Sequence, residues 1–327
     1  MGKNVTKTIQ LQKSIEDSWS VVFSRNIRSD FPVSILYVEP SKMYSGSQRL
    51  HWHAEFEINF VRTGTAIFNI GDSTVTVPSG NAIIIGGGRI HSVEDVSDGK
   101  CSIISVMFSP DFIFGSENKE VSMLTNKYYL PLTDNSFKYQ IFENKTDSGS
   151  SSIDIIQELL KVNLDKKYGF ELLTKSLLCR LWLQVMELHI ANNEPEKNSI
   201  NSFYDEQRVK IAISYISENY TRALTLEEIA DSVPVSKSEC CRCFKRVTRE
   251  TPFEYIMIER VFQVALLLQR PDSFDGSMQL LATQNGFNNA SYFNKTFKKY
   301  TGETPSQFKE SVRKKHRDAL SPFGIPM

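Results

Sequence analysis

The last third of the chain contains two segments with the same layout: a short helix, a tight turn and a longer basic helix. In the first segment, Thr225 and Glu228 form a capping box, which favours a helix over residues 226–232. A proline then breaks the helical pattern, and Ser236 is the predicted N-cap of a helix that runs through Arg246. This layout predicts a helix-turn-helix, the motif whose second helix enters the major groove of DNA.

The second segment repeats the layout further along the chain. Ser277 is the predicted N-cap of a helix over residues 278–284, residues 285–287 form the turn, and a longer helix covers residues 289–300. Between the two segments, residues 253–269 have helical periodicity. We therefore predict two helix-turn-helix units that one connecting helix holds at a fixed separation.

Helical geometry separates the core residues of the two longer helices from the residues that can reach DNA. Cys240 and Phe244 lie four residues apart and are expected to face the core, as is Phe297 together with Tyr292 or Phe293. The remaining positions are the predicted DNA contacts: Ser238, Glu239, Cys241, Arg242, Lys245 and Arg246 in the first helix, and Ser291, Asn294, Lys295, Lys298 and Lys299 in the second.

These side chains suit different parts of a DNA duplex. Arg242 and Lys295 can pair with guanine, Asn294 with adenine and Glu239 with the amine of cytosine, whereas the other cations suit phosphates. Residues 206–317 hold 18 basic and 13 acidic side chains, although the whole chain has 38 of each. This local excess of basic residues favours a polyanionic partner such as DNA. The alternative is that the charges of both helices are only exposed to solvent and bind nothing.

The stretch from Arg208 to Lys309 resembles the DNA-binding domain of the AraC/XylS family of bacterial transcription regulators. The matching segments are LTLEEIA, FKRVT with TPFEYI, and GFNNASYFNKTFKKYTGETPSQF. The resemblance implies a seven-helix monomeric unit that inserts two helices into successive major-groove segments, and activation by contact with RNA polymerase. It places base readers at Ser238, Glu239, Cys241 and Arg242 and at Ala290, Ser291, Asn294 and Lys295. Pro234 stands where the family has glycine, which predicts that the first helix is the weaker reader.

Residues 33–108 have a different pattern, in which short apolar runs are separated by turn residues rich in glycine. The runs cover residues 35–38, 57–61, 66–70, 82–85 and 103–108. Many short strands at regular spacing predict an all-β sandwich or small barrel.

Three histidines and one glutamate belong to this β-rich region. His51, His53 and Glu57 form the pattern H-x-H-x-x-x-E, and His91 follows a second glycine-rich segment; over about residues 45–95 this resembles the two cupin motifs. On one strand, residues 51, 53 and 57 point to the same side, so the four side chains can converge inside a barrel. We predict an effector pocket here, and we keep a divalent metal (Zn, Mn, Fe or Ni) and a purely structural role as alternatives.

After residue 150 the apolar period changes to three and four residues, which predicts two amphipathic helices with Ser152 as the first N-cap. Their leucine-rich surface either packs against the β-domain or pairs two copies of the chain, and we favour the second.

Residues 191–205 are polar and aperiodic. The predicted organisation is a cupin-like sensor domain (1–150), a helical dimerisation segment (151–190), a linker (191–205), an AraC-type double helix-turn-helix domain (206–317) and a tail (318–327).

The five cysteines form no disulfide framework, and the N-terminus has no apolar core of a signal peptide. No apolar run is long enough to cross a membrane. We therefore expect a cytoplasmic homodimer that is not an enzyme and binds promoter DNA under the control of a small molecule, sugars being the common class for the family. Two alternatives stay open: a metal-dependent cupin enzyme with a DNA-binding tail, and an architectural DNA-binding protein that ignores ligands.

Overall fold

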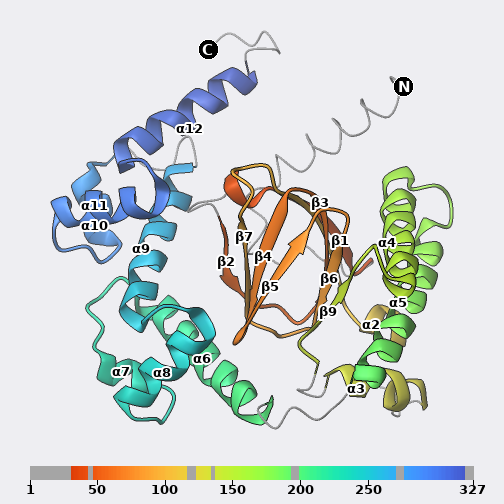
Figure 1. The fold of residues 1–327 in the computed structure, drawn as a ribbon. Coiled ribbons are helices and arrows are strands. Elements are labelled where there is room, and N and C mark those ends of the chain that lie inside the picture. The colour runs from red at the N-terminus through yellow and green to blue at the C-terminus, as the bar shows by residue number, and fades with distance from the viewer. Residues whose placement is uncertain are drawn as a thin grey trace. The chain divides into compact units, whose positions relative to one another are not determined.

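A computed structural model describes residues 31–42, 47–115, 123–133, 137–192, 199–269 and 276–320. Its contacts divide the chain into two compact units, Met1–Phe203 and Tyr204–Met327. The first unit combines β-strands with helices, and the second consists of helices (Figure 1). Residues 1–30 and residues 321–327 of the predicted tail lie outside the described residues.

The strands of the first unit form two antiparallel sheets, which confirms the predicted all-β core of this unit. One sheet has the order β1-β8-β3-β6-β9 and the other has the order β2-β7-β4-β5. The strands are β1 Val33–Val38, β2 Ser47–His51, β3 Phe56–Thr63, β4 Thr65–Ile70, β5 Ser73–Pro78, β6 Ala82–Ile85, β7 His91–Asp95, β8 Ser102–Phe108 and β9 Tyr139–Phe142.

Alternation along each strand divides the apolar side chains between two cores. In β3, Val61 joins the core between the two sheets, whereas Phe56 and Ile58 belong to a second core on the outer face of the five-stranded sheet. Helices α4 (Asp147–Asp165) and α5 (Phe170–Asn192) cover that outer face (Figure 1). Short helical segments precede them: α2 (Asp111–Phe114), a π-helical turn over Thr125–Tyr129 and α3 (Leu130–Thr133).

Helices α4 and α5 use much of their leucine-rich surface inside the unit. Leu177, Leu181 and Trp182 are buried in the core that they share with the five-stranded sheet. Packing against the β-domain, the alternative to dimer pairing, therefore accounts for these residues. The N-cap of α4 is Thr146, which accepts a hydrogen bond from a backbone N–H. The prediction of Ser152 was wrong because this serine lies inside the helix, fully buried.

Helix α6 (Ser199–Asn219) differs from the predicted linker. Residues 199–205 are helical, and residues 193–198 lie outside the described residues. The start of α6 is polar and shows no local period, but Asp205 is buried and pairs with an arginine from elsewhere in the second unit. A tertiary contact thus stabilises a turn of helix that the sequence pattern does not reveal.

The second unit contains the two predicted helix-turn-helix pairs. Its helices after α6 are α7 (Leu226–Asp231), α8 (Lys237–Thr248), α9 (Pro252–Gln269), α10 (Met278–Gln284), α11 (Ala290–Thr301) and α12 (Pro305–Leu320). The capping box of Thr225 and Glu228 is present, and Ser236, Ser277 and Asn289 each accept a backbone N–H at the start of α8, α10 and α11. The helix-turn-helix layout is therefore fixed by local capping.

Within the described part of the chain, the helices include none with the length and apolar content that crossing a bilayer requires.

Candidate nucleic-acid interface and barrel site

Helix α8 has one buried face and one polar face. Cys240, Cys243 and Phe244 are buried, as predicted from their spacing. Burial raises the pKa of the Cys240 thiol to about 11, so this cysteine stays protonated and packs as a small apolar group. The six predicted DNA contacts lie on the other faces: Ser238, Arg242, Lys245 and Arg246 are exposed, and Glu239 and Cys241 are partly exposed.

Two arginines of α8 already have acidic partners. The Arg242 guanidinium donates to Glu239 Oε2, one helical turn before it. Arg246 donates to Asp205 Oδ2 of α6, with Nε at 2.8 Å and Nη2 at 2.6 Å. Arg242 lies wholly on the α8 surface, whereas Arg246 also ties α8 to α6.

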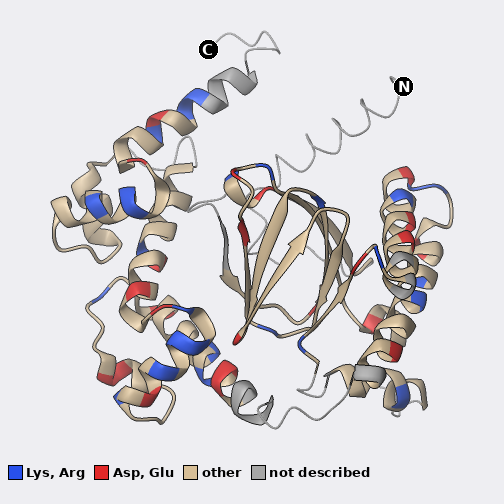
Figure 2. Ribbon diagram, in the orientation of Figure 1, with Lys and Arg blue, Asp and Glu red and all other residues tan. Residues whose placement is uncertain are grey.

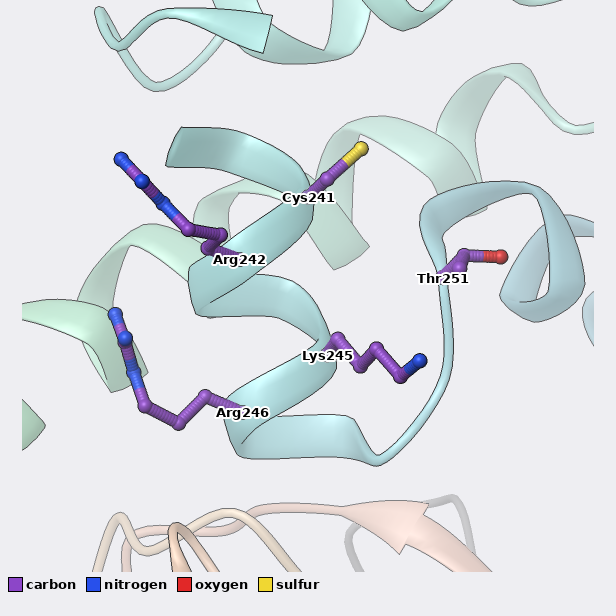
Figure 3. Close-up of a pocket in the computed structure, with 5 residues that line it drawn as sticks. All are labelled: Cys241, Arg242, Lys245, Arg246 and Thr251. Atoms are coloured by element: carbon purple, nitrogen blue, oxygen red, sulfur yellow. The ribbon is translucent and has the colours of Figure 1, made fainter. Parts of the chain in front are cut away.

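An open pocket lies beside α8, and its lining includes four of the predicted contacts. Figure 3 shows Arg242 and Arg246 extending from one side of the helix, and Cys241 and Lys245 extending from another side toward Thr251. Residues four apart on a helix share a face, which explains both pairs. The basic side chains of α8 therefore extend in two directions: Arg242 and Arg246 to one side of the helix, and Lys245 to another.

Helix α11 repeats the construction of α8. Phe293 and Phe297 are buried, which settles the choice between Tyr292 and Phe293 in favour of Phe293. The predicted contacts Ser291, Asn294, Lys295, Lys298 and Lys299 are all exposed, and Figure 2 shows basic residues on both α8 and α11. Tyr292 is 54% exposed on the same helix. The spacing alone leaves Tyr292 as a candidate for the core, but an exposed tyrosine at this position can also contact DNA.

Arg260 connects the backbone just before the first helix-turn-helix pair to the turn of the second pair. From α9 it donates to the carbonyl oxygens of Tyr220 and Arg222, both at 2.7 Å, and its guanidinium lies over the ring of Phe287. Gly286, in the second turn, has φ +82°, and a Cβ there would lie 2.8 Å from the guanidinium carbon. The contact therefore needs glycine, a requirement that the turn alone does not reveal.

The four residues of the predicted barrel site come from both sheets. His51 ends β2 and pairs in register with His91 of β7, in the four-stranded sheet, whereas Glu57 lies in β3 of the five-stranded sheet. His53 lies in the bend between β2 and β3. The expectation that residues 51 to 57 share one strand was wrong, because residues 52–55 leave the sheet. The side chains still come together.

A glycine run holds the bend in place. Gly88 donates its backbone N–H to the carbonyl oxygen of His53 at 2.6 Å. A Cβ on Gly87 would lie 2.3 Å from the carbonyl oxygen of Ala54, which is too close for any side chain. The approach of these two segments therefore needs glycine at position 87 and fixes where the His53 ring can lie.

The site is a compact cluster of three imidazoles and one carboxylate. One ligand atom from each of His51, His53, Glu57 and His91 lies within 4.8 Å of the other three. Glu57 Oε2 is 2.8 Å from His91 Nε2 and 3.4 Å from His53 Nε2, and Glu57 Oε1 accepts from the Ser105 hydroxyl at 2.5 Å. Ser105, 48 residues from Glu57, was missed because nothing local marks it.

Burial and charge act in opposite directions on these groups. Burial alone would raise the pKa of the Glu57 carboxyl, but the facing His53 and His91 rings hold that pKa well below its usual range. Burial lowers the pKa of His53, yet the facing Glu57 carboxylate more than offsets this, so the net shift is upward. The cluster therefore contains an ionised carboxylate that attracts positive charge.

The fold and the sites define a class of protein: a helical domain with two matched helix-turn-helix pairs that binds DNA, joined to a β-domain with a buried polar site. Family models agree with each half. Residues 32–123 match an AraC-like ligand binding domain, and residues 229–311 match a helix-turn-helix domain.

Relatives cover most of the chain. An uncharacterized HTH-type transcriptional regulator, YdeC of Bacillus subtilis, is 26% identical over 282 residues, which are 86% of this chain and 92% of the relative. The melibiose operon regulatory protein of Escherichia coli is 24% identical over 289 residues, 83% of this chain and 91% of the relative. Among solved structures, fatty-acid-bound ToxT of Vibrio cholerae aligns with a TM-score of 0.42 and 14% identity, over 88% of this chain and 97% of that one. The chain belongs to the AraC family of transcription regulators.

Proposed function

We propose that α8 and α11 read two successive major-groove segments of promoter DNA. The observation that carries this proposal is the matched construction of the two helices: each is capped by a side chain, buries an aromatic face and exposes polar and basic residues. Two such faces in one unit with an excess of basic residues are what a DNA-reading protein requires.

Each predicted contact has a role in this proposal. Arg242 and Lys295 pair with guanine, Asn294 with adenine and Glu239 with cytosine, because these groups complement those base edges. The remaining predicted contacts bind the backbone or pack in the groove: Ser238, Cys241, Lys245, Arg246, Ser291, Lys298 and Lys299. In the free protein Glu239 is paired with Arg242. Glu239 therefore has to release Arg242 before its carboxylate can bind a base.

The experiment is selection of bound sequences from random duplexes by the full chain, followed by fluorescence anisotropy on the selected site. Lys295→Ala should weaken binding and relax preference at one base pair, by about 1–3 kcal/mol. Lys161→Ala, an exposed lysine of α4 in the other unit, is the matched control and should bind like the parent. Selection that yields no preferred sequence would refute specific recognition by α8 and α11 and favour the architectural alternative.

We also infer that the β-domain is a sensor rather than an enzyme, and that its site at His51, His53, Glu57 and His91 receives the effector. The names of several relatives, regulators of the melibiose and raffinose operons, support a sugar as the effector class. An effector controls transcription only if it binds one arrangement of the two units more tightly than another. A thermal-shift screen of sugars against the full chain tests this, because binding raises the melting temperature.

The homodimer that we propose uses residues 151–190, but not their buried leucines. Leu172, Cys179, Leu183 and Ile190 are exposed on α5, and their spacings of 7, 11 and 18 residues place them on one face of the helix. This outer stripe is the part of the helical segment left to pair with a second copy. We further propose that the dimer acts in the cytoplasm and contacts RNA polymerase at the promoter.

A further inference from the structure

We propose that the barrel site is a binding site for one divalent transition-metal ion, held by His51, His53, Glu57 and His91. This inference deepens the proposed function, because it names the ligand chemistry of the sensor site. Hydrogen-bond roles, an unpartnered nitrogen, the distances between donor atoms and the choice of donor types each support it.

The first argument comes from where the histidine protons lie. His53 Nδ1 is 3.1 Å from the carbonyl oxygen of Glu55, and His91 Nδ1 is 2.8 Å from the carbonyl oxygen of Arg89. A carbonyl oxygen can only accept, so both Nδ1 atoms carry the hydrogen. In a neutral imidazole this leaves a lone pair on Nε2, and the Nε2 atoms of both rings face Glu57 Oε2. Three acceptors that face one another are stabilised by a positive charge between them, which either a metal ion or an added ring proton supplies.

The second argument comes from a polar atom without a partner. Among the residues that the structure describes, His53 Nε2 is the buried side-chain nitrogen or oxygen that makes no hydrogen bond. An unsatisfied polar atom is costly in a protein interior, and native proteins seldom leave one without a reason. Because this lone pair points toward the shared centre of the cluster, a cation there would satisfy it.

The third argument is the spacing of the donor atoms. Zinc–nitrogen and zinc–oxygen bonds of about 2.0–2.2 Å in a tetrahedron place the ligand atoms roughly 3.4 Å apart. Glu57 Oε2 and His53 Nε2 are 3.4 Å apart, and all four donors lie within 4.8 Å of one another. The donors that lie up to 4.8 Å apart would close by roughly an ångström when one ion binds. Apolar side chains such as Phe68 and Ile85 occupy the core between the sheets.

Groups around the donors complete the site. The carbonyl oxygens of Glu55 and Arg89 fix the orientation of two imidazoles, and the Ser105 hydroxyl fixes the Glu57 carboxylate. Outer partners of this kind orient metal ligands and tune their basicity. Three imidazole nitrogens and one carboxylate suit Zn²⁺, Fe²⁺ or Ni²⁺, whereas Mg²⁺ and Ca²⁺ prefer oxygen ligands. Because His51 and His91 belong to one sheet and Glu57 to the other, the ion would join the two sheets.

The test is metal loading of the full chain after treatment with a chelator. Elemental analysis should find one Zn²⁺ per chain, Co²⁺ should produce the visible absorption of a nitrogen-rich site, and Mg²⁺ should not compete. His53→Gln should weaken Zn²⁺ binding by more than about tenfold. His189→Gln, a histidine of α5 outside the cluster, is the matched control and should leave the affinity unchanged.

Two results would overturn the inference. The first is a folded, chelator-treated parent protein that takes up no Zn²⁺, Co²⁺, Ni²⁺ or Fe²⁺. The second is that His53→Gln and His189→Gln weaken Zn²⁺ binding equally, or that neither substitution weakens it. DNA binding is measured separately on the metal-free protein, so specific DNA recognition without metal uptake would remove the metal site alone. Metal uptake without specific DNA recognition would remove the proposed reading by α8 and α11 and leave the metal site.

Discussion

The substitution Arg246→Ala should destabilise the C-terminal unit, although the sequence predicts that Arg246 contacts phosphate. The Asp205 side chain is 7% exposed and the Arg246 side chain is 49% exposed. Without Arg246, the buried carboxylate keeps Arg208, whose Nη1 lies 3.5 Å away. Breaking a fully buried pair costs ~3–5 kcal/mol and an exposed pair ~0–1 kcal/mol. A half-exposed arginine with a remaining second partner places the loss at about 1–2 kcal/mol.

The assay uses the uneven distribution of tryptophan. All three tryptophans precede residue 204, so tryptophan fluorescence follows unfolding of the first unit only. Circular dichroism at 222 nm also follows the helical second unit. For a unit of this size each kcal/mol lowers the melting temperature by roughly 3–6 °C. Arg246→Ala should therefore lower the transition seen by circular dichroism and leave the fluorescence transition in place.

Lys245→Ala is the matched comparison, because Lys245 is exposed on the same helix and extends from a different side (Figure 3). We expect no loss of stability in this variant, but a salt dependence of DNA binding reduced by about one phosphate contact. If Arg246→Ala instead melts like the parent and shows the reduced salt dependence, the pair with Asp205 contributes nothing to stability. The reasoning from burial would then be refuted.

Other substitutions test the remaining sites. Arg242→Ala should cost about 1–3 kcal/mol at one base pair of the selected DNA site and relax its identity, whereas equal losses on all sequences would mean a phosphate contact. Asn289→Ala should lower the free energy of unfolding by ~1 kcal/mol in urea titrations, because α11 loses its N-cap. Leu172→Lys combined with Leu183→Lys should convert a dimer into a monomer in analytical ultracentrifugation; an unchanged mass would exclude this face. Ser105→Ala should weaken Zn²⁺ binding by about 10–100-fold with the stoichiometry retained, and unchanged affinity would show that the serine does not position the carboxylate.

The DNA-binding unit could be predicted in detail because its signals are local. Capping residues such as Thr225 and Ser277 mark helix starts, and the spacing of Cys240, Phe244 and Phe297 separates core from surface. Helix formation and helix faces depend on residues within a few positions of one another, so one sequence contains the information.

Features that depend on distant residues could not be predicted. The residues of the barrel site were identified from their spacing, but the single strand expected for them is interrupted by a bend that Gly87 accommodates from another segment. Asp205 and Ser105 act through partners 41 and 48 residues away. Neither residue has a sequence signature, because the role of a buried acid or hydroxyl depends on the group that it contacts in the folded protein.

The position of Arg260 has a consequence for the promoters that this regulator can use. One guanidinium ties the backbone just before the first helix-turn-helix pair to the turn of the second pair. We therefore expect the distance between the two reading helices to change little between one DNA site and another. One base pair inserted between the two recognised blocks turns the second block by about 34° around the duplex axis. Operators of this regulator should therefore vary in their bases but keep a constant number of base pairs between blocks.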